Sequence, residues 1–238
     1  SLGGILGALT SGIEPEHRAY ILNVPGAAIL TELAPNAPEL SGLLTGAAAL
    51  FFGLGRAQVS PHHPLTILMQ HVLDGGDPIH VARTAYLEPD PKTPRNVVIF
   101  EALHDEIMAN QATEALGRAM GARLVVPHGP TLATFVEGDG ASGVHDVPTV
   151  GATGVLVQLS PAQHGWDLFA KPGHRNYSAA PPVFDDPTHE VFTKLDKTIE
   201  FDNPYLEAQA LALQFIDDAF AGKVPTVKWT KAPAPVTD

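Results

Sequence analysis

The hydrophobic positions of the chain fall into two patterns, which predict strands and helices in alternation. Short, unbroken apolar runs are typical of buried parallel strands, and they lie at 19–24, 96–102 and 153–159. Apolar residues at helical spacing predict helices over 2–9, 110–120 and 204–221. Strands that alternate with helices indicate an α/β fold with a mostly parallel sheet flanked by helices.

The first of these helices is expected to be buried. Its large apolar residues have helical spacing and are separated by glycine and alanine, which permit close packing; they are Leu2, Ile5, Leu6 and Leu9. The turn 14–17 ends this helix and leads into the strand at 19–24.

An all-helical insertion is predicted over 29–92, where the composition becomes rich in glycine, alanine and leucine. Its run 43–54, with Phe51 and Phe52, is too short to span a bilayer. The run is interpreted as the core of a cap or, functionally, as an apolar lid that opens at a lipid interface or lines an acyl pocket. Asp77 is expected to cap a helical turn whose first position is Pro78.

Composition and charge exclude several classes of function. A chain of 238 residues with 45% hydrophobic residues can fill one core and carry an inserted subdomain. A net charge of −12 argues against a nucleic acid or an anionic membrane as partner. The absence of cysteine excludes disulfides, cysteine-bound zinc and thiol catalysis. The first residues carry no signal-peptide pattern, and no apolar run is long enough to cross a bilayer.

Three side chains in chain order suggest acyl-transfer chemistry, which needs a hydroxyl nucleophile, a histidine base and a carboxylate that orients the histidine. Ser1-Leu2-Gly3-Gly4 opens a helix, as the second half of a G-x-S-x-G nucleophile elbow does, and the residue two after the serine must be small. Asp105 follows the strand 96–102, and His164 follows the strand 153–159.

In this order and context, the three segments resemble the nucleophile elbow, the acid turn and the histidine loop of the α/β-hydrolase superfamily, and in particular a bacterial lipase or esterase. The resemblance extends over essentially the whole chain. It implies an α/β-hydrolase fold with a helical cap or lid. Its parts are the elbow helix and a core strand (1–28), the cap (29–92), the C-terminal part of the core (93–222) and a tail (223–238).

The resemblance also implies the roles of the residues. Ser1 is the nucleophile, His164 is the general base, and Asp105 rather than Glu106 orients the histidine. The N–H of Leu2 is one donor of the oxyanion hole. The substrate is a carboxylic ester or lipid, and neither a cofactor nor a metal is required. Similarity to large secreted or surface-anchored bacterial lipases favours a secreted or cell-envelope location, with at most peripheral membrane contact through the cap.

A complete hydrolase has several strands before its nucleophile, and Ser1 is the first residue of this chain. We therefore expect a preceding N-terminal polypeptide from the same precursor to complete the sheet beside the strand 19–24, which would otherwise expose a long edge. That polypeptide would supply the second oxyanion donor.

Several alternatives stay open. Ser1 is also compatible with an incidental chain end, or with an N-terminal nucleophile that uses its own α-amine as base. Asp105 also suits a cap for the helix that follows it. A peptidase or amidase would share the same three residues, and a non-catalytic relative would bind an apolar ligand beneath the cap.

The eleven histidines of the chain also suggest a metal site, but none shows an H-E-x-x-H or comparable spacing. We therefore interpret the histidines available as metal ligands as ordinary surface or core residues. They are His62, His63, His128, His145, His174 and His189. Of these, His174 and His189 are rivals to His164 as the base, although both lie in the proline-rich stretch 171–200, to which no strand leads.

Overall fold

The computed structural model describes residues 1–55, 60–102, 105, 107–125, 137–138, 152–159, 164, 204–225 and 227. The strands are β1 (Ala19–Asn23), β2 (Asn96–Ala102), β3 (Arg123–Val125), β4 (Glu137–Gly138) and β5 (Gly154–Leu159). The α-helices are α1 (Leu2–Ile13), α2 (Ala34–Asn36), α3 (Pro38–Phe52), α4 (Pro64–Leu73), α5 (Ala82–Ala85), α6 (Asn110–Met120) and α10 (Pro204–Phe220). A π-helix (Ile29–Leu33) and two 3₁₀ turns (Asp74–Gly76 and Pro78–His80) complete the regular elements.

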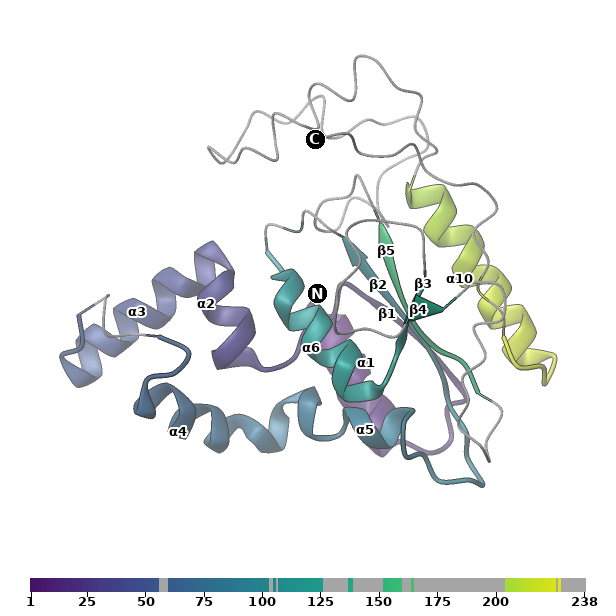
Figure 1. The fold of residues 1–238 in the computed structure, drawn as a ribbon, viewed down its shortest axis with the longest axis horizontal. Helices are drawn as coiled ribbons and strands as arrows, with labels where there is room; N and C mark the ends of the chain where they lie inside the picture. Colours follow the sequence, from purple (N-terminus) through teal and green to yellow (C-terminus); the bar gives the residue numbers. More distant parts are fainter. Residues whose placement is uncertain are drawn as a thin grey trace, which may run out of the picture.

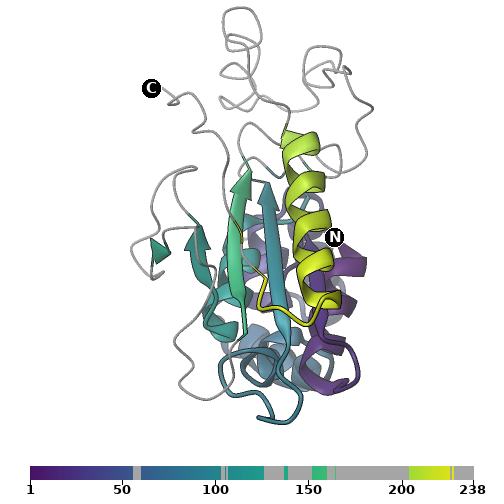
Figure 2. The same ribbon diagram turned by 90° about the vertical axis from the view of Figure 1, so that its right-hand side faces the viewer.

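The described strands form one parallel sheet in the order β1-β2-β5-β3-β4. The three strands predicted from the sequence are β1, β2 and β5, and they are neighbours in this sheet. Figure 2 shows β2 and β5 side by side behind α10, with their carboxyl ends at the same edge. The chain therefore belongs to the α/β class, as the hydrophobic pattern predicted.

Helices cover both faces of the sheet because successive strand residues point to opposite faces (Figure 1). On β2, Val98 and Phe100 face the side covered by α10, where Phe215 is fully buried. Val97 and Ile99 face the side covered by α1, α5 and α6. The central strands are buried on both faces, which explains their unbroken apolar sequences.

Helix α1 packs on the sheet through its small residues, and the prediction that its large apolar residues are buried is wrong for Leu2 and Leu6. Ala8 and Ser11 are buried, whereas Leu2, Leu6 and Ile13 are exposed. A Cβ atom added at Gly12 would lie 2.5 Å from Val81, which shows how closely the small face approaches α5. The small residues allow this close approach. Ile5 is partly buried against the core, whereas Leu2, Leu6 and Ile13 lie on the outer face.

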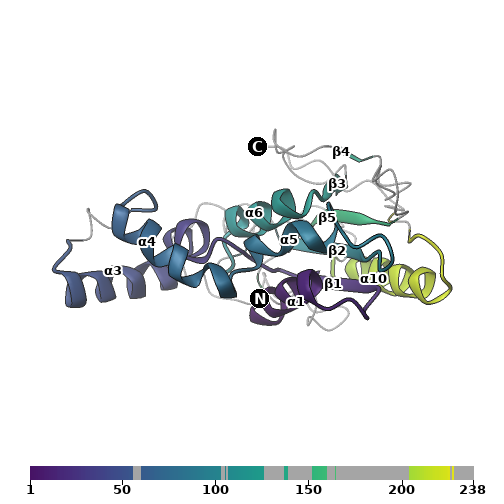
Figure 3. The ribbon, with the colours of Figure 1, turned by 90° about the horizontal axis from the view of Figure 1, so that it is seen from below.

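The elements described between residues 29 and 92 are all helices. Figures 1 and 3 show α3 and α4 projecting away from the sheet, at the far end of the molecule from α10. Leu50 is 78% exposed and Phe51 is 72% exposed, so the interpretation of 43–54 as the core of the cap is wrong. None of the helices within the described residues combines the length and apolar character that a bilayer crossing requires.

The sequence pattern did not predict β3, and over 131–151, which contains β4, it indicated loops with some irregular strand; the two strands extend the sheet beyond β5. Strand β3 has three residues and β4 has two, so neither has room for a recognisable apolar period. The stretch 171–200 and most of the tail 223–238 lie outside the described residues.

Candidate functional site

The three residues singled out from the sequence lie beside or beyond the carboxyl ends of three neighbouring strands. Asp105 follows the end of β2, and His164 follows the end of β5. Ser1 precedes α1, and its amino group donates a hydrogen bond of 2.8 Å to the carbonyl oxygen of Asn23, the last residue of β1. Ligands of open parallel sheets bind at this edge because the connecting loops meet there.

The Asp105 carboxylate is held by the backbone of its own turn. Its Oδ1 atom accepts hydrogen bonds from the N–H groups of Ile107 (2.9 Å) and Met108 (2.6 Å). The Asp105 side chain is 1% exposed. Helix α6 begins after Ala109, which is its N-cap, so the interpretation of Asp105 as a helix cap is wrong. Glu106 lies outside the described residues.

His164 is in direct contact with Asp105. Its Nδ1 atom lies 2.8 Å from Oδ2 and 2.8 Å from Oδ1 of the carboxylate, and its side chain is 13% exposed. A carboxylate accepts a hydrogen bond and does not donate one, so this contact favours the tautomer with the proton on Nδ1. Nε2 then carries the lone pair that can take a proton from a hydroxyl group.

Ser1 is fixed at the start of α1. Its carbonyl oxygen accepts a hydrogen bond of 3.0 Å from the N–H of Ile5, and its side chain does not cap the helix. The α-amine donates to the carbonyl of Asn23, and Ser1 opens a helix rather than a strand, so the geometry does not favour an α-amine base. The structure thus brings Asp105 and His164 together and holds Ser1 at the end of the neighbouring strand β1.

Leu2 is the first residue of α1, and its side chain is 65% exposed. The first four N–H groups of a helix have no partner within it, and the helix dipole makes this end partly positive. The N–H of Leu2 therefore belongs to a group of donors suited to an oxyanion.

The sequence motif requires a small residue at position 3, two after Ser1, but in the structure the residue that must be small is at position 4. A Cβ atom added at Gly3 would meet nothing within 4 Å in the described residues, whereas one at Gly4 would lie 2.6 Å from the carbonyl oxygen of Asn23. Gly4 lets α1 approach the end of β1, and this close approach keeps Ser1 near the sheet edge.

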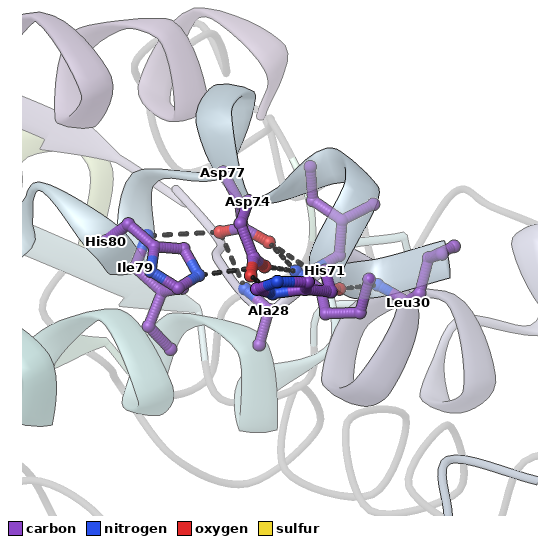
Figure 4. Close-up of polar contacts among 9 residues, drawn as sticks. Ala28, Leu30, His71, Asp74, Asp77, Ile79 and His80 are labelled. Atoms are coloured by element: carbon purple, nitrogen blue, oxygen red, sulfur yellow. Dashed lines mark hydrogen bonds and ion pairs between the residues drawn. The ribbon is translucent and has the colours of Figure 1, made fainter. Parts of the chain in front are cut away.

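A second polar cluster lies in the helical insertion and is centred on Asp77, which is fully buried (Figure 4). Its carboxylate accepts hydrogen bonds from the N–H groups of Ala28, Ile29 and Ile79 and from the side-chain amide of Gln70. The bond from Ile79 confirms the predicted cap, with Pro78 in the first turn. Asp77 therefore joins the start of the insertion to the segment between α4 and α5.

Asp74 lies beside Asp77 in Figure 4 and contacts two histidines. Its carboxylate oxygens lie 2.7 Å from Nδ1 of His71 and 2.8 Å from Nε2 of His80. Partial burial raises the pKa of Asp74, but hydrogen bonds from these histidines and from Gln70 outweigh it and hold the pKa below the ordinary value. Within the described part of the chain, no group of three or more metal-ligating side chains is arranged to hold a metal ion.

The histidines considered as metal ligands are only partly described. His62 is exposed, and His63 Nδ1 accepts a hydrogen bond from the N–H of Leu65 at the start of α4. The others lie outside the described residues, and they are His128, His145, His174 and His189.

The structure adds two buried polar residues that the sequence analysis overlooked, Glu101 on β2 and Gln158 on β5. They are direct cross-strand partners, and Gln158 Nε2 donates to Glu101 Oε2 at 2.8 Å. Burial raises the pKa of Glu101 to about 7. Each residue is the second-to-last of its strand and interrupts an apolar run, and that shared position is the signal in the sequence.

A cleft of about 530 Å³ lies at the opposite edge of the sheet, and its lining does not include Ser1, Asp105 or His164. Its lining includes Arg18, Lys92 and Asn96, which precede or begin β1 and β2. Because ligands of parallel sheets bind at the carboxyl ends of the strands, the Asp105–His164 edge is the better candidate site.

Comparison with known proteins gave no relative: neither the protein families, nor the curated proteins, nor the solved structures contain a match to this chain.

Proposed function

We propose that this chain carries the site of a serine hydrolase that cleaves carboxylic esters, with Ser1, Asp105 and His164 as its triad. The observation that carries the proposal is the contact between His164 Nδ1 and the buried Asp105 carboxylate. A carboxylate in this position orients the imidazole and stabilises the imidazolium that forms when Nε2 takes a proton. The location of Ser1 at the end of the adjacent strand supports its role as the nucleophile.

The proposed reaction proceeds through an acyl-serine. Ser1 Oγ attacks the ester carbonyl carbon while its proton passes to Nε2 of His164. The negative charge on the former carbonyl oxygen is stabilised by N–H groups at the start of α1, including that of Leu2. The C–O bond to the alcohol then breaks, and His164 returns the proton to the leaving alcohol. Water then attacks the acyl carbon while its proton passes to Nε2 of His164. The bond from the acyl carbon to Ser1 Oγ breaks, His164 returns the proton to Oγ, and the carboxylic acid is released.

We further propose that the sheet is the C-terminal part of an α/β-hydrolase fold. The proposal is supported by the order of the candidate residues along the chain, serine, aspartate, histidine, each beside the carboxyl end of β1, β2 or β5. It is also supported by the distribution of the helices, with α1 and α6 on one face of the sheet and α10 on the other.

A preceding polypeptide that completes the sheet stays a prediction, and two observations support it. β1 is the edge strand of the described sheet, so one of its sides has no strand partner there. The outer face of α1 presents Leu2, Leu6 and Ile13 at 54% to 65% exposure. A further strand and its flanking layer would cover both features.

The proposed substrates are apolar esters and lipids. Most of the large apolar residues that are exposed within the described residues lie on α3 and α4. Those on these two helices are Leu43, Leu50, Phe51, Phe52, Ile67, Leu68, Met69, Val72 and Leu73. Between residues 40 and 73, Arg56 is the one residue with a formal charge. Many exposed apolar side chains on neighbouring elements are typical of a lipid or protein contact, and contact with uncharged lipid is compatible with the net charge of −12.

The experiment that tests the function is hydrolysis of p-nitrophenyl esters from acetate to palmitate. Ser1→Ala and His164→Ala are expected to lower kcat/KM at least about 1,000-fold, because removal of a triad member leaves only the residual effect of binding and the oxyanion hole. Asp105→Asn should also reduce kcat strongly, because it removes the charge that stabilises the imidazolium.

Ser41→Ala and His80→Ala serve as matched controls and should retain the rate. Full activity of His164→Ala, or a wild-type protein that hydrolyses amides but no esters, would overturn the proposed ester hydrolysis.

A further inference from the structure

Glu101 occupies a position that the proposed triad leaves unexplained. It is fully buried on β2, four residues before Asp105, and it faces Gln158 across to β5. Asp105 and His164 follow these two strands in the sequence. A buried carboxyl group is costly, so its hydrogen-bond partners indicate what it contributes.

Those partners connect three elements. Gln158 Nε2 donates to Glu101 Oε2 at 2.8 Å, and Asn110 Nδ2 donates to Glu101 Oε1 at 3.1 Å. Asn110 Nδ2 also donates to the carbonyl oxygen of Ala102 at 2.8 Å. Asn110 is the first residue of α6 and Ala102 is the last of β2, so Asn110 links the two ends of the turn that contains Asp105.

We propose that Glu101 is a positioning residue for the reaction, which acts through Gln158 and Asn110 to hold the Asp105 turn in place relative to the strand that leads to His164. This inference rests on the proposed hydrolase function. Glu101 touches neither Ser1 nor His164 in the contacts described above, so its effect is on geometry. A displacement of about 1 Å of a catalytic group can cost roughly 100-fold in rate.

The charge of Glu101 is not what the network requires. Burial raises its pKa to about 7, with a smaller contribution from Glu114, while Gln158, Asn110 and Arg118 act in the opposite direction. The side-chain Oε1 of Gln158 is buried and accepts no hydrogen bond from the residues that the structure describes. A neutral amide at position 101 could donate to that oxygen after a flip of Gln158, and its own oxygen could still accept from Asn110.

This alternative hydrogen-bond arrangement defines a conservative and a disruptive variant. Glu101→Gln should keep both links, and its kcat should stay within about threefold of wild type with no loss of activity above pH 7. Glu101→Leu fills a similar volume without polar atoms, and its kcat should fall roughly 10- to 100-fold with KM changed less than about threefold.

Thr153→Val is the matched control for stability. Thr153 is buried at the opposite end of β5, and its hydroxyl donates to the carbonyl oxygen of Pro225. Loss of this bond should lower the melting temperature without changing kcat. A merely structural role for Glu101 would give Glu101→Leu the same behaviour.

The test measures ester hydrolysis of the full chain and, in parallel, the proton NMR resonance of the His164 Nδ1–H group. The proposal expects that resonance to shift or broaden in Glu101→Leu and to stay in place in Glu101→Gln and Thr153→Val. Unchanged kcat and resonance in Glu101→Leu would overturn the proposal, and so would equal losses in Glu101→Leu and Glu101→Gln. If the wild type hydrolyses no ester, the proposed function fails, and the NMR comparison still decides the positioning role.

Discussion

At the scale of single residues, two polar pairs lie at the carboxyl ends of β2 and β5: the contact between Asp105 and His164, and the buried pair Glu101 and Gln158. Asp105 and His164 were selected because each follows a buried strand, and the structure brings them into contact. Glu101 and Gln158 were overlooked because a polar residue inside an apolar run does not disturb the prediction of a strand. Their pairing depends on which strands are neighbours, and β2 and β5 are separated by more than 50 residues in the sequence.

The raised pKa of Glu101 predicts how stability depends on pH. The pKa is 4.5 for an ordinary glutamate and about 7 in the folded protein, so the unfolded chain loses this proton first as the pH rises. Glu101 therefore reduces the free energy of unfolding progressively between about pH 4.5 and 7, by roughly 3 kcal/mol in total, since each tenfold change in acidity is worth about 1.4 kcal/mol.

Glu101→Gln should lack this decrease. In urea unfolding at pH 4.5, 6 and 8, the difference in free energy between Glu101→Gln and wild type should move in favour of the variant as the pH rises. Glu16→Gln, an exposed substitution, should follow the wild type throughout. Parallel pH curves for Glu101→Gln and wild type would contradict the burial of an ionisable group at this position.

At the scale of elements, the sequence predicted the strands and helices that have regular hydrophobic patterns. It did not predict features that depend on how these elements pack against one another. The predictions for 96–102 and 110–120 coincide with β2 and α6. Helix α1 was predicted, but its orientation was wrong, because the spacing of large apolar residues cannot reveal that the small-residue face packs more closely on the sheet. β3 is too short for a periodic pattern, and its pairing with β5 and β4 identifies it as a strand.

The attachment of the helical insertion depends on Asp77. Asp77→Ala would leave the N–H groups of Ala28, Ile29 and Ile79 without this acceptor, and each buried unpaired group costs about 1–3 kcal/mol. The variant should therefore lose on the order of 3 kcal/mol or more in the free energy of unfolding measured with urea.

His71→Ala is the matched control for the same cluster. The His71 side chain is 82% exposed and contacts the carboxylate of Asp74 rather than that of Asp77, so its removal should change stability far less than Asp77→Ala does. Equal losses for the two variants would show that Asp77 does not anchor the insertion.

At the scale of the whole molecule, the two ends differ in character. The sheet and its covering helices form a conventional α/β core, whereas α3 and α4 extend from it with exposed apolar side chains (Figure 3). The sequence marked the insertion by its composition but could not show whether its apolar residues face inward. The burial of these apolar side chains depends on whether another layer of structure packs on α3 and α4.

The projecting helices are predicted to bind lipid surfaces. Replacing Phe51 and Val72, which are 72% and 78% exposed, with serine should weaken cosedimentation with phosphatidylcholine vesicles at least about tenfold, because burial of each large apolar side chain contributes about 1.5–3 kcal/mol.

The paired control replaces Leu213 and Phe220 of α10, which are 64% and 88% exposed, with serine. Vesicle binding should then stay at the wild-type value. Equal weakening by the two pairs would mean that exposed apolar residues bind lipid wherever they lie, and that α3 and α4 have no special role.

The most direct test of the proposed triad is covalent trapping of the nucleophile. The protein is incubated with a fluorophosphonate, and the modified peptide is identified by mass spectrometry. We predict stoichiometric labelling at Ser1, with a labelling rate that falls at least about 100-fold in His164→Ala because the base is lost. Absence of labelling at Ser1, or labelling at another serine at an undiminished rate in His164→Ala, would contradict the assignment of Ser1, Asp105 and His164.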